Sequence, residues 1–241
     1  MIMELSKLIY LLFLISRLWG RMDGIYYVDK SAVNAWADRL NRAFVENGMT
    51  ERARSVSITF YNMPTMVLGA SNCNGWIALN SAWQYENFVL YGKPLWVDTI
   101  AHELAHHYQG FGCGSEIGSV ESEAEAMGWE ALASLDDDEA KGALLYALRD
   151  TLRVMVMVRL AEKGGDASVI LSATLPDDKE RGAFAKSFEW CTTNLSKCKE
   201  YSRRYAEGAF KKALSDRRMD NFRRFWKSLL GDFCFQKYCP L

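Results

Sequence analysis

Residues His102, Glu103 and His106 form the pattern HExxH, whose side-chain types and spacing point to metal-assisted hydrolysis. Residues four apart lie on one face of a helix, so both imidazoles can reach a single metal ion. Neutral imidazole nitrogen is a ligand that suits zinc. Glu103 follows His102 directly and is expected to face the same opening of the metal site, where it can accept a proton from metal-bound water. The pattern therefore predicts a mononuclear zinc site with Glu103 as the general base.

Two imidazoles leave a zinc ion under-coordinated, so a further protein ligand must come from elsewhere in the chain. The chain has three histidines, and the third, His107, is expected to point off the shared face of the helix toward solvent. Families that supply a distant third histidine are therefore excluded. The remaining choices for the third ligand are a carboxylate or a cysteine.

A second helix, predicted over residues 120–135, follows a loop marked by glycines at 110, 112, 114 and 118 and begins with several acids. We expect Glu121 to be the third zinc ligand, because a carboxylate from a neighbouring helix completes a two-histidine, one-glutamate site. Glu123 points to a different face and is the alternative ligand. Glu125 lies one turn after Glu121, where an acid can orient a ligand imidazole.

Residues 99–108 (TIAHELAHHY) and 121–128 (ESEAEAMG) resemble the gluzincin branch of the zincin metallopeptidases. The second stretch is similar to the E-x-E-A-D/N segment of the CaaX-processing and heat-shock membrane proteases, and of the soluble repressor-cleaving and radiation-response metallopeptidases. In those families the first glutamate binds zinc and the residue four positions later supports a ligand histidine. The resemblance implies these roles for Glu121 and Glu125, and a zinc-dependent endopeptidase that cleaves a peptide or protein substrate.

Two features depart from the family pattern. Glu125 stands where aspartate or asparagine is usual, and the interval from His106 to Glu121 is short. These departures keep Glu123 open as a ligand. The resemblance covers residues 55–135 and does not extend to the C-terminal hundred residues.

Hydrophobic spacing predicts the elements that must position these residues. Ser31 is a plausible N-cap and Gly48 a helix end, Asn74–Gly75 is typical of a hairpin, and Gly92 with Pro94 should separate two helices. Helices are expected over residues 3–19, 31–47, 81–91, 95–109 and 120–135 and over most of the chain after 138, with strands over residues 55–61, 65–70 and 76–80.

This order of elements predicts an α+β fold, with a zincin-like core that contains a small sheet and the active-site helix. We divide the chain into an apolar N-terminal helix (1–20), the metallopeptidase core (21–165) and a basic helical C-terminal extension (166–241). By the family resemblance, the strand 76–80 or its hairpin partner forms the sheet edge that aligns an extended peptide. An ordinary amphipathic hairpin is the alternative interpretation.

The N-terminal apolar run, Leu8 to Ile15, lies between Lys7 and Arg17 and is too short to span a bilayer. It fits a docked helix, a membrane-surface anchor or an export signal, and membrane association through residues 1–19 is one hypothesis. Six cysteines permit disulfides or free thiols. The compartment stays open, with a cytoplasmic location slightly favoured.

Residues 197–227 contain eleven Lys or Arg against four Asp or Glu. Such a segment could bind nucleic acid or anionic lipid, which gives the rival hypothesis of a non-catalytic interaction protein on a zincin scaffold. The simpler interpretation is a pair of amphipathic helices whose aromatic residues pack inward. The acidic run 136–139 is interpreted as a helix start, because it lacks the spacing of a calcium loop.

Overall fold

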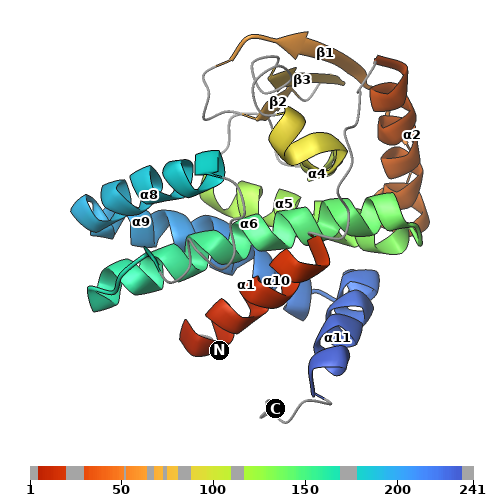
Figure 1. Cartoon of the computed structure of the whole chain (residues 1–241). Helices are drawn as coiled ribbons and strands as arrows, with labels where there is room; N and C mark the ends of the chain where they lie inside the picture. The colour runs from red at the N-terminus through yellow and green to blue at the C-terminus, as the bar shows by residue number, and fades with distance from the viewer. Residues whose placement is uncertain are drawn as a thin grey trace.

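The computed structural model describes residues 5–19, 30–51, 53–63, 68–72, 75–80, 88–109, 117–168 and 178–234. Helices make up most of it, and a small three-stranded sheet lies at one end (Figure 1). This arrangement confirms the predicted α+β class. The helices are α1 (Leu5–Trp19), α2 (Lys30–Glu46), α4 (Phe88–Tyr108), α5 (Ile117–Ser134), α6 (Asp138–Lys163), α8 (Asp178–Thr193), α9 (Leu195–Ser202), the π-helical turn η1 (Arg203–Glu207), α10 (Gly208–Ser215) and α11 (Asp220–Cys234).

The sheet has the strand order β1-β3-β2. Strand β3 (Trp76–Asn80) pairs in parallel with β1 (Ser57–Tyr61) and antiparallel with β2 (Gly69–Asn72), as the predicted hairpin requires. Because β3 is paired on both sides, the expectation that residues 76–80 form a sheet edge is wrong. The other predicted choice, its hairpin partner β2, is an edge strand.

Helix α4 runs without interruption through Gly92 and Pro94, so the predicted break between two helices is wrong. Proline in a helix interior removes one backbone hydrogen bond and costs about 3 kcal/mol. The turns that follow bury Trp96, Val97 and Ile100 in the core, and this packing offsets the local cost. The part of the predicted break that falls on residues 81–87 lies outside the described residues.

Two predicted helix boundaries also differ from the structure. Ser31 is the second residue of α2 and therefore is not its N-cap, whereas Gly48 has a positive φ of 66° and ends that helix as predicted. Gly118 belongs to the first turn of α5 and not to the preceding loop. In both cases the helix begins earlier than the hydrophobic spacing indicated.

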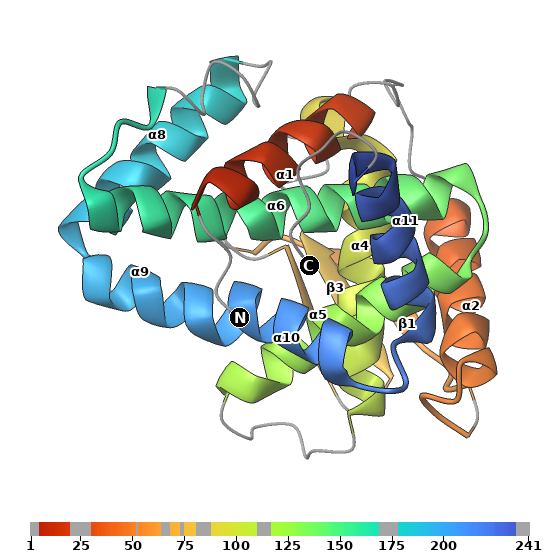
Figure 2. The same ribbon diagram turned by 90° about the horizontal axis from the view of Figure 1, so that it is seen from below.

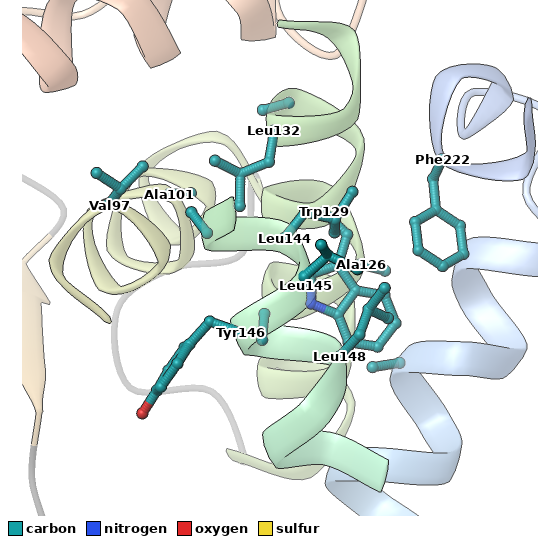
Figure 3. Close-up of a cluster of buried hydrophobic side chains, with 14 of the residues drawn as sticks. Val97, Ala101, Ala126, Trp129, Leu132, Leu144, Leu145, Tyr146, Leu148 and Phe222 are labelled. Carbon is teal, nitrogen blue, oxygen red and sulfur yellow. The ribbon is translucent and has the colours of Figure 1, made fainter. Parts of the chain in front are cut away.

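The hydrophobic core lies where α4, α5 and α6 meet, and α11 closes one side of it (Figure 3). Trp129 of α5 is fully buried at its centre, with ring centroids 5.0 Å from Phe210 of α10 and 5.3 Å from Phe222 of α11. Trp226 joins the same stack, 5.2 Å from Phe210. These aromatic residues of the basic segment are thus used in packing, as the simpler interpretation of their spacing predicted.

A buried glutamate fixes α11 to this core. Glu130 of α5 accepts hydrogen bonds from the backbone N–H groups of Asn221 (3.1 Å) and Phe222 (2.7 Å) at the start of α11. A carboxylate at this end of a helix satisfies otherwise unpaired donors and interacts favourably with the helix dipole. Asp137 likewise caps α6 by accepting from the N–H of Ala140 at 2.9 Å, which confirms the helix-start interpretation of the acidic run.

Several cations of residues 197–227 form ion pairs within the chain. At least five of the eleven form ion pairs, and three of these five, Lys199, Lys212 and Arg218, contact acids outside the segment. These pairs are Lys199–Glu162, Arg204–Glu200, Lys212–Glu123, Arg218–Asp216 and Arg223–Asp220. Cys191 and Cys198 form a disulfide between α8 and α9. Binding of nucleic acid or anionic lipid by this segment stays a prediction.

Helix α1 lies across α6 (Figure 2) and buries Leu8, Leu11, Leu12 and Ile15. Among the described residues, no helix combines the length and apolarity that a membrane span needs. The arrangement is that of the docked helix, one of the three interpretations of the N-terminal segment. Anchoring at a membrane surface and export stay untested.

The docked position of α1 gives a stability prediction. Leu12→Ala should lower the free energy of unfolding by about 2–5 kcal/mol, because it leaves a cavity under a fully buried side chain. Lys7→Ala, on the exposed face of the same helix, should change it by less than about 0.5 kcal/mol. Chemical denaturation of the two variants measures the difference, and equal stabilities would contradict docking of α1 in the core.

Candidate metal centre

Three side chains from two helices converge on one point. The Nε2 atoms of His102 and His106 on α4 lie 3.1 Å apart. Oε2 of Glu121 on α5 lies 3.1 Å from the first nitrogen and 3.6 Å from the second. These residues form the one group of potential metal ligands found among the described residues.

The triangle formed by these three atoms has the size of one face of a zinc coordination tetrahedron. Zinc–nitrogen and zinc–oxygen bonds of about 2.0–2.1 Å, set at tetrahedral angles, place neighbouring ligand atoms about 3.3 Å apart. The three observed separations, 3.1, 3.1 and 3.6 Å, lie on both sides of this value. The donor set of two imidazoles and one carboxylate therefore fits zinc in both chemistry and spacing, and it leaves a fourth position for solvent or substrate.

Close packing of α5 on α4 makes this convergence possible. A Cβ atom added at Gly128 of α5 would lie 3.3 Å from the backbone carbonyl carbon of Ala101 and 3.4 Å from the backbone nitrogen of His102. These separations are tighter than ordinary contacts, so a side chain at 128 would require the neighbouring α4 backbone to shift by a few tenths of an ångström. Glu121 lies about two turns before Gly128 on the same helix, and at the observed helix separation its carboxylate reaches both imidazoles.

The other ring nitrogen of each histidine has its own acceptor. Nδ1 of His102 donates to Oε2 of Glu125 at 2.8 Å, and Nδ1 of His106 donates to Oε1 of Gln109 at 2.9 Å. With the proton held on Nδ1, the Nε2 lone pair faces the shared point, which is the tautomer that a metal ligand needs. The contact between Glu125 and a predicted ligand histidine is the one expected from the sequence.

Glu121 and Glu123, the two alternatives for the third ligand, face different neighbours. The carboxylate of Glu123 lies 3.0 Å from Nζ of Lys212 and 3.6 Å from Arg218, both in the C-terminal part of the chain. Glu121 is the acid that lies against the imidazoles. The structure thus brings together His102, His106 and Glu121 and places Glu123 in an ion-pair cluster.

Glu103, the predicted general base, is buried beneath the edge strand of the sheet. A Cβ atom added at Gly69 of β2 would lie 2.9 Å from Oε1 of Glu103 and 2.7 Å from Cγ2 of Thr99. The absence of a side chain at 69 therefore lets β2 approach the carboxylate directly. Glu103 also lies close enough to His102 for its charge to raise the pKa of that imidazole.

The protonation states of the cluster follow from its packing. Burial alone would lower the pKa of His102, but hydrogen bonds to Glu121 and Glu125 raise it well above its ordinary value. Burial alone would raise the pKa of Glu121, but hydrogen bonds from His102 and His106 bring it below its ordinary value. The carboxylates therefore favour positive charge at the shared point, and a divalent cation can supply that charge in place of protons.

His107 is buried, with 3% of its surface exposed, so the expectation that it faces solvent is wrong. It lies one helical turn after Glu103, on the face of α4 that also carries Thr99. Neither ring nitrogen has a hydrogen-bond partner in the described part of the chain. Burial, with smaller contributions from Arg54 and His106, lowers the pKa of His107 and favours the neutral ring.

Several side chains of this region were not identified from the sequence. Gln109 lies three residues after His106, so its side chain can reach the His106 ring. This spacing could have identified Gln109 from the sequence. Gly69 and Tyr205 approach the site from a strand and from the C-terminal helices. Their roles depend on tertiary packing, which spacing along the chain does not encode.

Comparisons with protein-family models, curated proteins and solved structures found no match to this chain.

The two glutamates give a matched test of the candidate site. Glu121→Gln should weaken zinc binding by at least about 100-fold, since loss of even an outer partner of a zinc ligand costs 10- to 100-fold. Glu123→Gln should leave the affinity unchanged, because its carboxylate faces Lys212. Competition with a chromophoric chelator measures both affinities. Equal loss in the two variants would argue against Glu121 as the specific ligand.

Proposed function

We propose that the protein is a zinc-dependent endopeptidase with a zincin-like core. The observation that carries this proposal is the triangle of His102, His106 and Glu121, whose edges match those expected around one tetrahedral zinc ion. Both histidines come from an HExxH helix and the carboxylate comes from the next helix, as in the metallopeptidases that the sequence resembles. An open fourth position distinguishes catalytic from structural zinc sites.

Each residue of the centre has a separate part in peptide hydrolysis. His102, His106 and Glu121 would hold the ion, while Glu125 and Gln109 keep the two imidazoles in the required tautomer. Zinc at this point would act as a Lewis acid toward the scissile carbonyl and lower the pKa of water to about 7. Glu103 would accept a proton from the attacking water and return it to the departing amine.

The position of the edge strand β2 is an argument for a peptide substrate. Strand β2 is unpaired on one side within the described sheet and passes directly over Glu103 at Gly69. An extended peptide could add to this edge by main-chain hydrogen bonds, and its backbone would then lie near the Glu103 carboxylate. Recognition of this kind uses the peptide backbone and accepts many sequences, so side-chain specificity would come from elsewhere.

The role of Glu103 has a direct test. Glu103→Gln should retain stoichiometric zinc, since this residue is not among the converging ligand atoms, but should reduce peptide cleavage by about 10²–10⁴-fold. A proteome-derived peptide library, with and without chelator, measures cleavage, and Glu123→Gln serves as the folded control. Undiminished, chelator-sensitive cleavage by Glu103→Gln would remove this residue from the mechanism.

The close approach of β2 gives a second test. Gly69→Ala places a methyl group within 3 Å of Glu103 and Thr99, so the base must shift while the metal ligands stay in place. We expect reduced cleavage with unchanged zinc affinity, because small displacements of reacting groups have large kinetic costs. Ala70→Ser, at the next position of the strand and directed to its other face, is the control. Full activity of Gly69→Ala would show that the strand does not position the base.

A further inference from the structure

A tyrosine from the C-terminal helices reaches the candidate metal centre. The hydroxyl of Tyr205, in η1, donates a hydrogen bond to Oε2 of Glu125 at 3.1 Å. The same oxygen accepts from Nδ1 of His102 at 2.8 Å, and the other oxygen accepts from Nε1 of Trp129 at 3.0 Å. Three donors thus fix both oxygens of a buried carboxylate, and Tyr205 is the donor furthest away in sequence.

The backbone around Tyr205 is adapted to this approach. Residues 203–207 form a π-helical turn, which holds one residue more than an α-helical turn and changes the direction of the side chains that follow. The next residue, Gly208, packs against α5 so closely that an added Cβ would lie 2.9 Å from Cβ of Ser122. Figure 2 shows α9 and α10 as one nearly continuous rod, of which α9 packs against α6 and α10 packs against α5. The turn and the glycine together bring Tyr205 to Glu125.

The charges around this hydrogen bond keep Tyr205 as the donor and Glu125 as the acceptor. Burial and the neighbouring charge of Glu125 raise the pKa of Tyr205 well above its ordinary value, so the hydroxyl stays protonated and acts as the donor. The ring of Tyr205 lies 5.5 Å from that of Tyr201, centroid to centroid, and the two rings are stacked. Tyr201 makes no hydrogen bond to Glu125 and is half exposed, which makes it a matched control.

We infer that Tyr205 is a positioning residue of the metal centre, which acts through Glu125 to hold the His102 imidazole in its ligand orientation. The consequence for metal binding rests on the proposed function, whereas the effect on His102 does not. Without the Tyr205 hydroxyl, Glu125 would keep two donors among the described residues, Trp129 and His102, and its Oε2 could rotate away from Nδ1. The C-terminal helices therefore complete the centre, although every direct ligand lies before them in the chain.

The test compares Tyr205→Phe with Tyr201→Phe, each of which removes one hydroxyl and keeps its ring. Long-range ¹H–¹⁵N spectra of the metal-free protein report the protonation state and environment of His102, and three histidines make the assignment simple. Zinc affinity is measured by chelator competition, and near-ultraviolet circular dichroism checks that each variant is folded. We expect Tyr205→Phe to shift the His102 ring signals and weaken zinc binding by about tenfold, the lower end of the cost of losing an outer-shell partner. Tyr201→Phe should do neither.

A further variant tests whether the effect passes through Glu125. In a Glu125→Ala background, Tyr205→Phe should change neither the His102 signals nor the zinc affinity further, because the shared partner is already gone. If Tyr205→Phe alone does not fold, Glu125→Ala alone supplies the readout, because it removes the carboxylate that links Tyr205 to His102. Additive effects of the two substitutions, or His102 signals in Tyr205→Phe identical to those in Tyr201→Phe, would overturn the inference. Failure of the wild-type chain to bind zinc, with the His102 shift still present, would overturn the proposed function alone.

Discussion

The distance between α4 and α5 is the constraint on which the candidate site depends. HExxH places two imidazoles on one face of a helix, but a zinc ion needs a third ligand from another element. Gly128 lets α5 approach the α4 backbone at Ala101, and Glu121 then meets His102 and His106 with separations close to those of a zinc tetrahedron.

The remaining elements act on this helix pair from two sides. The sheet covers α4, and Gly69 brings the edge strand β2 onto Glu103. The C-terminal helices cover α5, where Trp129 both packs in the aromatic core and donates to Glu125. Hydrophobic packing and the orientation of a proposed ligand histidine therefore share one residue, so that damage to the aromatic core should be transmitted to His102.

Local features of the site could be predicted from the sequence, whereas features that depend on tertiary packing could not. The spacing of His102 and His106, and of Glu121 and Glu125, follows from helical periodicity and survives in the structure. The helix break at Pro94 was wrong because burial of the following turns outweighs one lost hydrogen bond. Strand β3 lies in the centre of the sheet because it pairs in parallel with β1. The Asn74–Gly75 turn predicts only its pairing with β2. The expectation that His107 faces solvent was wrong because the helix position alone does not show which other element covers that face.

The coordination chemistry of the bound ion tests the central claim most directly. X-ray absorption spectroscopy of the zinc-loaded protein measures the types of ligand atom and their distances from the metal. A site formed by His102, His106 and Glu121 predicts one zinc per chain, with nitrogen and oxygen ligands at about 2.0–2.1 Å and the multiple scattering of two imidazoles. A shell of sulfur at about 2.3 Å, or no stoichiometric binding of zinc, would contradict it.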